Sequence, residues 1–215
     1  MRAFYDLAYF IFGLLSLPLF FRRMKQARNP QKLLAERFGF FSPQPAVSWP
    51  GSAEGFVWVH AVSVGEVMAV KNFLQGFVMR FPDYKILLTT VTPTGQNVAA
   101  SLGIERIQLG YFPFDFSFAC RRFFRRWRPR CVFLVETEIW PNFLAEAART
   151  GVPVGIINAR LSEKSFQRYR RFSPLFRSLF ERLAFVLAQA PEDAERFASL
   201  GVSPDRIEVL GNMKF

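Results

Sequence analysis

The sequence is poor in the side chains that usually bind metals. Its 215 residues include one histidine and two cysteines, and the separation of Cys120 and Cys131 matches no metal-ligand spacing. We therefore predict no metal site and no bound cofactor. Two ordinary reduced thiols are typical of a protein of the cytoplasm.

Acidic side chains are also scarce. The chain has 17 Asp and Glu against 28 Lys and Arg, which gives a formal net charge of +11 at pH 7. This excess indicates an anionic partner, and composition leaves a membrane, a nucleic acid and a phosphorylated substrate open. An apolar fraction of 51%, with 27 phenylalanines, is ample for a core of one large domain or one and a half.

The apolar run near the N-terminus is short for a membrane span. It extends from Leu7 to Phe21, 15 residues against the roughly 20 that a spanning helix needs. Only Arg2 precedes it, no small-residue cleavage site follows it, and basic residues come after it, so the positive-inside rule places the rest of the chain in the cytoplasm. We favour a membrane anchor or deep interfacial helix. A buried core helix and a cleaved signal peptide are the alternatives.

The remaining sequence predicts an α/β fold. Residues 1–28 form the anchor with its basic flank, residues 29–55 a proline-rich connector with a short helix at 32–38, and residues 56–215 alternate between strands and helices. Such alternation predicts a doubly wound, Rossmann-like, mainly parallel sheet. We expect strands at 56–59, 85–90, 106–109, 131–136, 152–158, 184–188 and 207–210. Helices are expected at 67–81, 95–102, 117–127, 141–150, 162–172, 174–183 and 191–200.

The turn after the first strand carries Ser63, Gly65 and Glu66, and two interpretations of Glu66 stand. Ser63-x-x-Glu66 has the spacing of a capping box, in which the serine caps the helix and the glutamate reaches back. The other interpretation is a partly buried carboxylate at the carboxyl edge of the sheet, where ligands bind, which accepts a proton from a substrate hydroxyl. A single glutamate does not decide between them.

Two further strand ends carry polar groups. Thr92 and Pro93 begin a helix well, and the hydroxyls and helix N–H groups from Thr92 to Gly95 suit a sugar or an anion. Glu136 and Glu138 follow another strand, where alternation predicts that both point into the crevice of Glu66. Two carboxylates at a strand end are a poor choice for solubility alone, which favours a functional role.

Two basic segments each have both a purely structural and a functional interpretation. The set Arg160, Lys164, Arg168, Arg170 and Arg171 is either a solvated face or a cationic mouth for carboxylate and phosphate groups, and Arg160 is the strongest candidate. In Arg121–Arg130, arginines alternate with Phe123, Phe124 and Trp127. This pattern is typical of nucleic-acid binding or of an interfacial helix, and the apolar run upstream favours the membrane.

Six sequence blocks occur in an order and spacing that resemble bacterial Kdo transferases: HAVSVGEV (60–67), TTVTPTG (89–95), FPFD (112–115), VETEIWPN (135–142), INARLSEKS (157–165) and GNMKF (211–215). That family moves 3-deoxy-D-manno-oct-2-ulosonic acid (Kdo) from CMP-Kdo to the lipid A precursor lipid IVA. The resemblance implies one half of a two-domain type B glycosyltransferase fold. The chain would be its N-terminal, acceptor-binding half, without the donor-binding C-terminal half.

The resemblance also implies roles for individual residues. Glu66 would be the catalytic base, Glu136 a transition-state stabiliser, and Lys214 a second stabiliser that offsets charge on the departing CMP. Substrate-binding positions would be Ser63, Gly65, Thr92, Pro93, Thr94, Gly95, Glu138 and Arg160.

The expected setting follows from the same resemblance. The partners would be CMP-Kdo, the lipid A precursor and anionic inner-membrane lipids, and not nucleic acid. The domain would face the cytoplasm from the inner membrane, and transfer would invert the anomeric centre. We expect the 215-residue chain alone to be inactive. A non-catalytic membrane-bound module that binds anionic lipid or nucleic acid is the alternative from another functional class.

Overall fold

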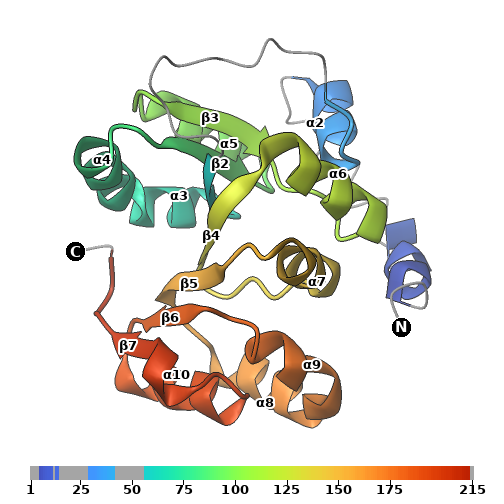
Figure 1. Ribbon diagram of the computed structural model, residues 1–215, viewed down its shortest axis with the longest axis vertical. Coiled ribbons are helices and arrows are strands. Elements are labelled where there is room, and N and C mark those ends of the chain that lie inside the picture. Colours follow the sequence, from blue (N-terminus) through green and yellow to red (C-terminus); the bar gives the residue numbers. More distant parts are fainter. Residues whose placement is uncertain (1–4, 12, 15–28, 42–55, 214–215) are drawn as a thin grey trace.

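The computed structural model describes residues 5–11, 13–14, 29–41 and 56–213, and its centre is a parallel sheet (Figure 1). Seven strands lie in the order β3-β2-β1-β4-β5-β6-β7, and all neighbours pair in parallel. The strands are β1 (Phe56–His60), β2 (Lys85–Thr90), β3 (Ile107–Tyr111), β4 (Pro129–Val135), β5 (Val154–Ala159), β6 (Phe185–Ala188) and β7 (Ile207–Val209). The predicted doubly wound fold is confirmed, because parallel neighbours need helical crossovers.

Helices connect the strands as predicted, with one exception. They are α2 (Pro30–Arg37), α3 (Val64–Ala69), α4 (Lys71–Arg80), α5 (Pro93–Ser101), α6 (Ser117–Trp127), α7 (Pro141–Thr150), α8 (Glu163–Arg171), α9 (Ser173–Phe180) and α10 (Pro191–Ser199), with a 3₁₀ turn at Pro204–Arg206. The single helix expected at 67–81 is wrong. The chain leaves helical geometry at Val70 (φ −93°, ψ 2°), and α3 and α4 are separate helices.

Apolar side chains cover both faces of the sheet. On one face, Trp58 stacks on Phe123 with 4.8 Å between ring centroids, meets Phe143 edge-on, and donates its indole N–H to Thr89 Oγ1 (2.7 Å). On the other face, α3, α4 and α5 pack through residues such as Val67 and Leu74. Burial on both faces explains why the central strands read as continuous apolar runs.

The phenylalanines of the basic and aromatic segment around α6 have a different role from either predicted one. Phe123 and Phe124 are core residues, 0% and 3% exposed, so they neither enter a bilayer nor stack on bases. Two arginines of the same helix, Arg121 and Arg125, are instead exposed to solvent. The aromatic half of this pattern is therefore the inner face of an amphipathic helix.

Only parts of the predicted anchor and connector lie within the described residues. Residues 5–11 and 13–14 are helical, and this helix lies beside the start of α6 in Figure 1. Among the described residues, none of the helices combines the length and apolar character that crossing a bilayer requires. In the connector, the expected helix at 32–38 is α2, whose first residue Pro30 follows the capping side chain of Asn29.

A buried carboxylate joins two loops at the ligand-binding edge of the sheet. Asp115, 1% exposed, follows β3 and accepts hydrogen bonds from the N–H groups of Asn142 (3.1 Å) and Phe143 (2.7 Å). Both N–H groups lie in the first turn of α7, where a helix provides no backbone acceptor for them, and the N-cap residue Trp140 makes no side-chain cap. Asp115 therefore caps α7 from a distant part of the sequence.

We predict that Asp115→Ala destabilises the fold by about 2–4 kcal/mol, because it leaves two buried N–H groups without an acceptor. Asp115→Asn should cost less, since one amide oxygen still accepts. Chemical denaturation measures both, with Asp83→Ala at an exposed turn as the matched control. Equal stability of Asp115→Ala and the control would contradict the assigned cap.

Candidate active site

The strand order places a crevice at the centre of the sheet. Along the chain the order runs outward from β1 to β3 and then reverses, because β4 lies on the other side of β1. At such a reversal the loops that follow the two adjacent strands diverge, and ligands of open α/β sheets bind at this point. The loops that follow β1, β4 and β5 meet here.

A cavity of about 270 Å³ lies at this edge, and groups of both charges line it. They are the carboxyl groups of Glu66, Glu136 and Glu138 and the guanidinium groups of Arg160 and Arg168. Thr137, Leu161, Ser162, Ser165 and Tyr169 complete the lining. The structure thus brings together four of the predicted site residues, Glu66, Glu136, Glu138 and Arg160.

The turn after β1 does not form the predicted capping box. Ser63 occupies the N-cap position of α3 but makes no side-chain cap. Instead, its hydroxyl donates to Glu66 Oε1 (3.0 Å), and the Val62 N–H donates to Glu66 Oε2 (2.7 Å). Glu66, 9% exposed, is therefore held by two donors, one at each carboxylate oxygen.

The loop after β2 supports the Glu66 turn but does not line the cavity. Thr92 caps α5 by accepting the Gly95 N–H (3.0 Å), and its own N–H donates to Val62 O (3.3 Å). A side chain at Gly95 would lie 3.4 Å from the Ser63 carbonyl carbon and 2.9 Å from Thr92 Oγ1, so glycine permits this close packing. Ser63, Gly65 and the segment 92–95 are thus neighbours of the cavity and not its lining.

Glu136 and Glu138 reach the cavity by a route that strand alternation does not describe. β4 ends at Val135, and Glu136 has a left-handed backbone (φ 62°) that turns the chain across the end of the sheet. The Glu136 N–H donates to Ile157 O (3.0 Å) in β5. The two carboxylates share a cavity, as predicted, because of this turn and not because they share a strand face.

The environment of Glu138 favours its protonated form. Burial raises the pKa of Glu138 to about 7; the hydrogen bond from the Trp140 indole N–H (2.8 Å) opposes this, and the charges of Glu66 and Glu136 add to it. One of the three carboxyl groups is therefore about half protonated near pH 7. A neutral carboxyl group offers a donor as well as an acceptor.

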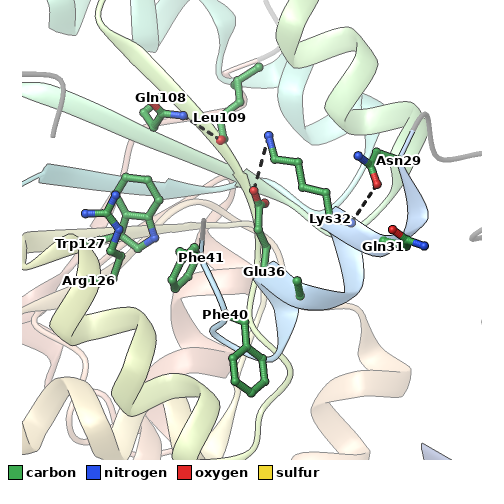
Figure 2. A pocket seen from close by; sticks show the side chains of 11 residues that line it. Asn29, Gln31, Lys32, Glu36, Phe40, Phe41, Gln108, Leu109, Arg126 and Trp127 are labelled. Carbon is green, nitrogen blue, oxygen red and sulfur yellow. Dashed lines mark hydrogen bonds and ion pairs between the residues drawn. The ribbon is translucent and has the colours of Figure 1, made fainter. Parts of the chain in front are cut away.

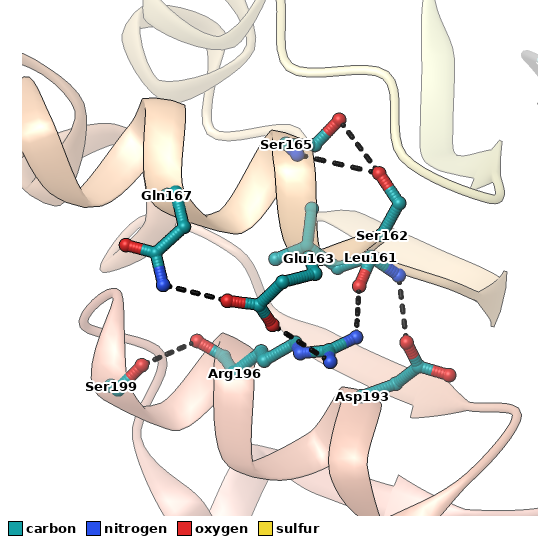
Figure 3. A network of polar contacts seen from close by, with 8 residues as sticks. All are labelled: Leu161, Ser162, Glu163, Ser165, Gln167, Asp193, Arg196 and Ser199. Carbon is teal, nitrogen blue, oxygen red and sulfur yellow. Dashed lines mark hydrogen bonds and ion pairs between the residues drawn. The ribbon is translucent and has the colours of Figure 1, made fainter.

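A network of polar contacts fixes the loop that follows Arg160 (Figure 3). The backbone of Leu161 donates to Asp193 Oδ1 (2.8 Å) and accepts from Arg196 Nη1 (2.6 Å), while Arg196 also pairs with Glu163 (2.9 Å). Ser162 caps α8 through the Ser165 N–H. Two residues of α10 thus hold the loop that follows Arg160.

Some predicted positions remain untested. Lys214 lies outside the described residues. The last described residue, Met213, donates its N–H to Asn158 Oδ1 (3.0 Å) at the end of β5, where Asn158 has a left-handed backbone (φ 50°). The sequence analysis did not single out Thr137, Ser162, Ser165 or Tyr169. Thr137, Ser162 and Ser165 lie within the blocks 135–142 and 157–165, and the N-cap pattern of Ser162 is a further signal in this segment.

A second and larger hollow, about 330 Å³, lies between α2, β3 and the end of α6 (Figure 2). Lys32, Phe41, Arg126 and Trp127 are among its lining residues. Its single carboxylate, Glu36, accepts the Tyr111 N–H (3.2 Å) and pairs with Lys32 (3.7 Å). We prefer the smaller cavity as the active site, since it combines several carboxylates with the sheet edge where strand order reverses.

Comparisons with known proteins identify related sequences and folds. Residues 32–215 match the family model described as 3-deoxy-D-manno-octulosonic-acid transferase (kdotransferase). The 3-deoxy-D-manno-octulosonic acid transferases of Bordetella pertussis and Haemophilus influenzae are 36% and 32% identical, over 90% and 89% of this chain. The chain spans only 45% and 44% of those proteins.

A solved structure supports the fold. UDP-GlcNAc 2-epimerase from Neisseria meningitidis, bound to UDP-GlcNAc, superposes with a TM-score of 0.54 over 74% of this chain and 47% of its own. At 14% identity this similarity concerns the fold alone.

We predict that Glu138→Gln stabilises the protein above pH 7. Between about pH 4.5 and 7 the unfolded chain releases the Glu138 proton while the folded chain keeps it, so stability falls as pH rises. The glutamine removes this loss, a gain of about 1–3 kcal/mol at pH 8 that vanishes near pH 4. Denaturation at pH 4, 6 and 8 measures it.

Glu195→Gln, at an exposed position of α10, is the matched control for the lost charge. The same pH dependence in the wild type and in both variants would show that Glu138 titrates normally.

Proposed function

The chain belongs to the 3-deoxy-D-manno-octulosonic-acid transferase family, and on this premise we propose that it is the acceptor-binding half of a glycosyltransferase. In the whole protein, Kdo passes from CMP-Kdo to a lipid A precursor. The observation that carries this proposal is the cavity at the reversal of strand order, which is lined by a carboxylate held by two donors and by two arginines. The C-terminal half of the whole protein holds the donor.

Glu66 is the proposed catalytic base. Its carboxylate is oriented by the Val62 N–H and the Ser63 hydroxyl, and an oriented base within hydrogen-bond reach of an acceptor hydroxyl takes its proton as the oxygen attacks. The oxygen forms a bond to the anomeric carbon while the bond from that carbon to CMP breaks on the opposite face. The anomeric centre is inverted, and no covalent enzyme intermediate forms.

The other carboxyl groups take different roles in this proposal. Glu136 faces the positive charge that develops on the ketosyl carbon, and Lys214 offsets the negative charge on the departing CMP. Glu138, about half protonated near pH 7, donates to or accepts from a hydroxyl of the acceptor sugar. Arg160 binds an anionic group of a substrate, which suits both its charge and its place in the lining of the cavity.

We also propose that the protein acts at the cytoplasmic face of the inner membrane. The N-terminal helix, described at residues 5–11 and 13–14, exposes an apolar stripe with helical spacing, formed by Leu7, Phe10, Ile11 and Leu14, each about half exposed. Exposed arginines of α6 lie on the neighbouring helix, and the net charge is +11. An apolar stripe beside cationic side chains suits anionic lipids.

The catalytic role of Glu66 predicts the outcome of one conservative exchange. In a two-domain enzyme, made by joining the C-terminal half of a relative, Glu66→Gln should lower the transfer rate by about 10²–10⁴-fold. Stability should change little, because the amide accepts from Val62 and donates to the Ser63 hydroxyl. Steady-state kinetics and thermal denaturation measure the two effects.

Ser63→Ala is the companion variant. It removes one donor to Glu66 but no proton acceptor, so it should cost about 0.5–1.5 kcal/mol of stability and spare most of the rate. If the Glu66→Gln enzyme kept wild-type turnover, Glu66 would not be the catalytic base and its role would be structural.

The membrane proposal predicts selective binding to lipid. The 215-residue chain should float with anionic vesicles that contain lipid IVA and bind RNA weakly, since Phe123 and Phe124 are buried and cannot stack on bases. Leu7→Ser combined with Phe10→Ser should reduce flotation at least about tenfold, since two exposed apolar side chains are lost.

Met79→Ser, at an exposed apolar residue of α4, is the control and should leave flotation unchanged. Strong RNA binding without a preference for lipid would favour the non-catalytic module instead.

A further inference from the structure

The N-terminal helix has two dissimilar edges. Its outer edge is the exposed stripe of Leu7, Phe10, Ile11 and Leu14. Its inner edge carries Tyr5, Asp6 and Tyr9, none of which is exposed, and the Tyr9 ring meets Phe116 edge-on with 5.0 Å between centroids. A helix that served only as an anchor would have no need of a carboxylate on its inner edge.

Asp6 binds the first turns of two different helices. Its Oδ1 accepts from the Ser117 N–H (3.1 Å) and its Oδ2 from the Ser117 hydroxyl (2.6 Å), at the first residue of α6. Oδ1 also accepts from the side-chain amide of Asn142 (2.7 Å), in the first turn of α7. The N-cap residue of α6, Phe116, has no side chain that could satisfy this end, so Asp6 supplies the missing acceptor.

Asn142 connects this contact to the cavity. Its amide group also donates to Asp115 O (2.7 Å), and its backbone N–H donates to Asp115 Oδ2. Only Pro141 separates it from Trp140, whose indole holds Glu138. Asp6 and Asp115 therefore both accept hydrogen bonds from Asn142, which lies where the loop that carries Glu136 and Glu138 continues into α7.

We propose that Asp6 is a positioning residue through which the N-terminal helix fixes the carboxylate-bearing loop 136–140. This inference rests on the proposed function only in treating that loop as part of the active site.

The test uses the 215-residue chain without substrate, so its outcome is independent of whether Glu66 is a base. The probes are amide hydrogen exchange and the indole ¹⁵N–¹H resonance of Trp140, assigned with Trp140→Phe. In Asp6→Ala, the Ser117 amide should exchange at least about tenfold faster, and amides at 139–143 should also exchange faster. The Trp140 indole resonance should move, whereas that of the core residue Trp58 should not.

Two further variants separate positioning from a general loss of stability. Asp6→Asn retains an oxygen that accepts from Ser117 and Asn142, so it should restore most of the protection and the wild-type Trp140 resonance. Asp83→Ala removes an exposed carboxylate and should change neither probe. If Asp6→Ala accelerates exchange at Ser117 alone and the Trp140 resonance stays in place, the helix is tied to α6 without positioning the loop, and the proposal is overturned.

Discussion

The parallel pairing of β1 with both β2 and β4 is the constraint on which the site depends. Parallel neighbours end at the same edge of the sheet, so residues that follow β1, β4 and β5 meet although 70 to 94 positions separate Glu66 from Glu136 and Arg160. The backbone joins the loops directly: the Glu136 N–H binds Ile157 O in β5, and the Val91 N–H binds Val62 O across the first two loops. The cavity is thus a consequence of strand order, and loop sequence supplies its chemistry.

Three carboxyl groups in one cavity repel one another when all are ionised, and the structure limits this cost in two ways. The Val62 N–H and the Ser63 hydroxyl hold the charge of Glu66, whereas burial leaves Glu138 with a pKa of about 7. The two arginines that line the same cavity provide a favourable field for negative charge. A carboxyl group whose pKa is raised towards neutrality, as that of Glu138 is, can take part in acid and base chemistry.

Periodicity and turn residues predicted the alternating strands and helices well, because burial on both faces of the sheet leaves a strong apolar signal in each strand. They failed where a single backbone angle decides the structure. At Val70, where α3 ends and α4 begins, no glycine or proline indicates a helix break. The positive φ of Glu136 is rare for a residue with a side chain. The capping-box interpretation rested on spacing alone, and spacing does not reveal that the Ser63 hydroxyl and the Val62 N–H both donate to Glu66. In α6 the arginine and phenylalanine pattern was visible, but only tertiary packing assigns the phenylalanines to the core.

The residues that support the site belong to the same sequence blocks as the site itself. Asp115 closes the FPFD block and caps the helix that follows Trp140, while Asn142 ends the block that begins with Val135 and contains Glu136 and Glu138. A loop that bears charged groups at a sheet edge would otherwise cost conformational entropy to order during binding. The N–H groups of Asn142 and Phe143 donate to the buried carboxylate of Asp115 and so order the loop in advance, and a preorganised carboxylate stabilises developing charge without further rearrangement. The spacing within these blocks therefore encodes a wall of the cavity together with the contacts that keep it rigid.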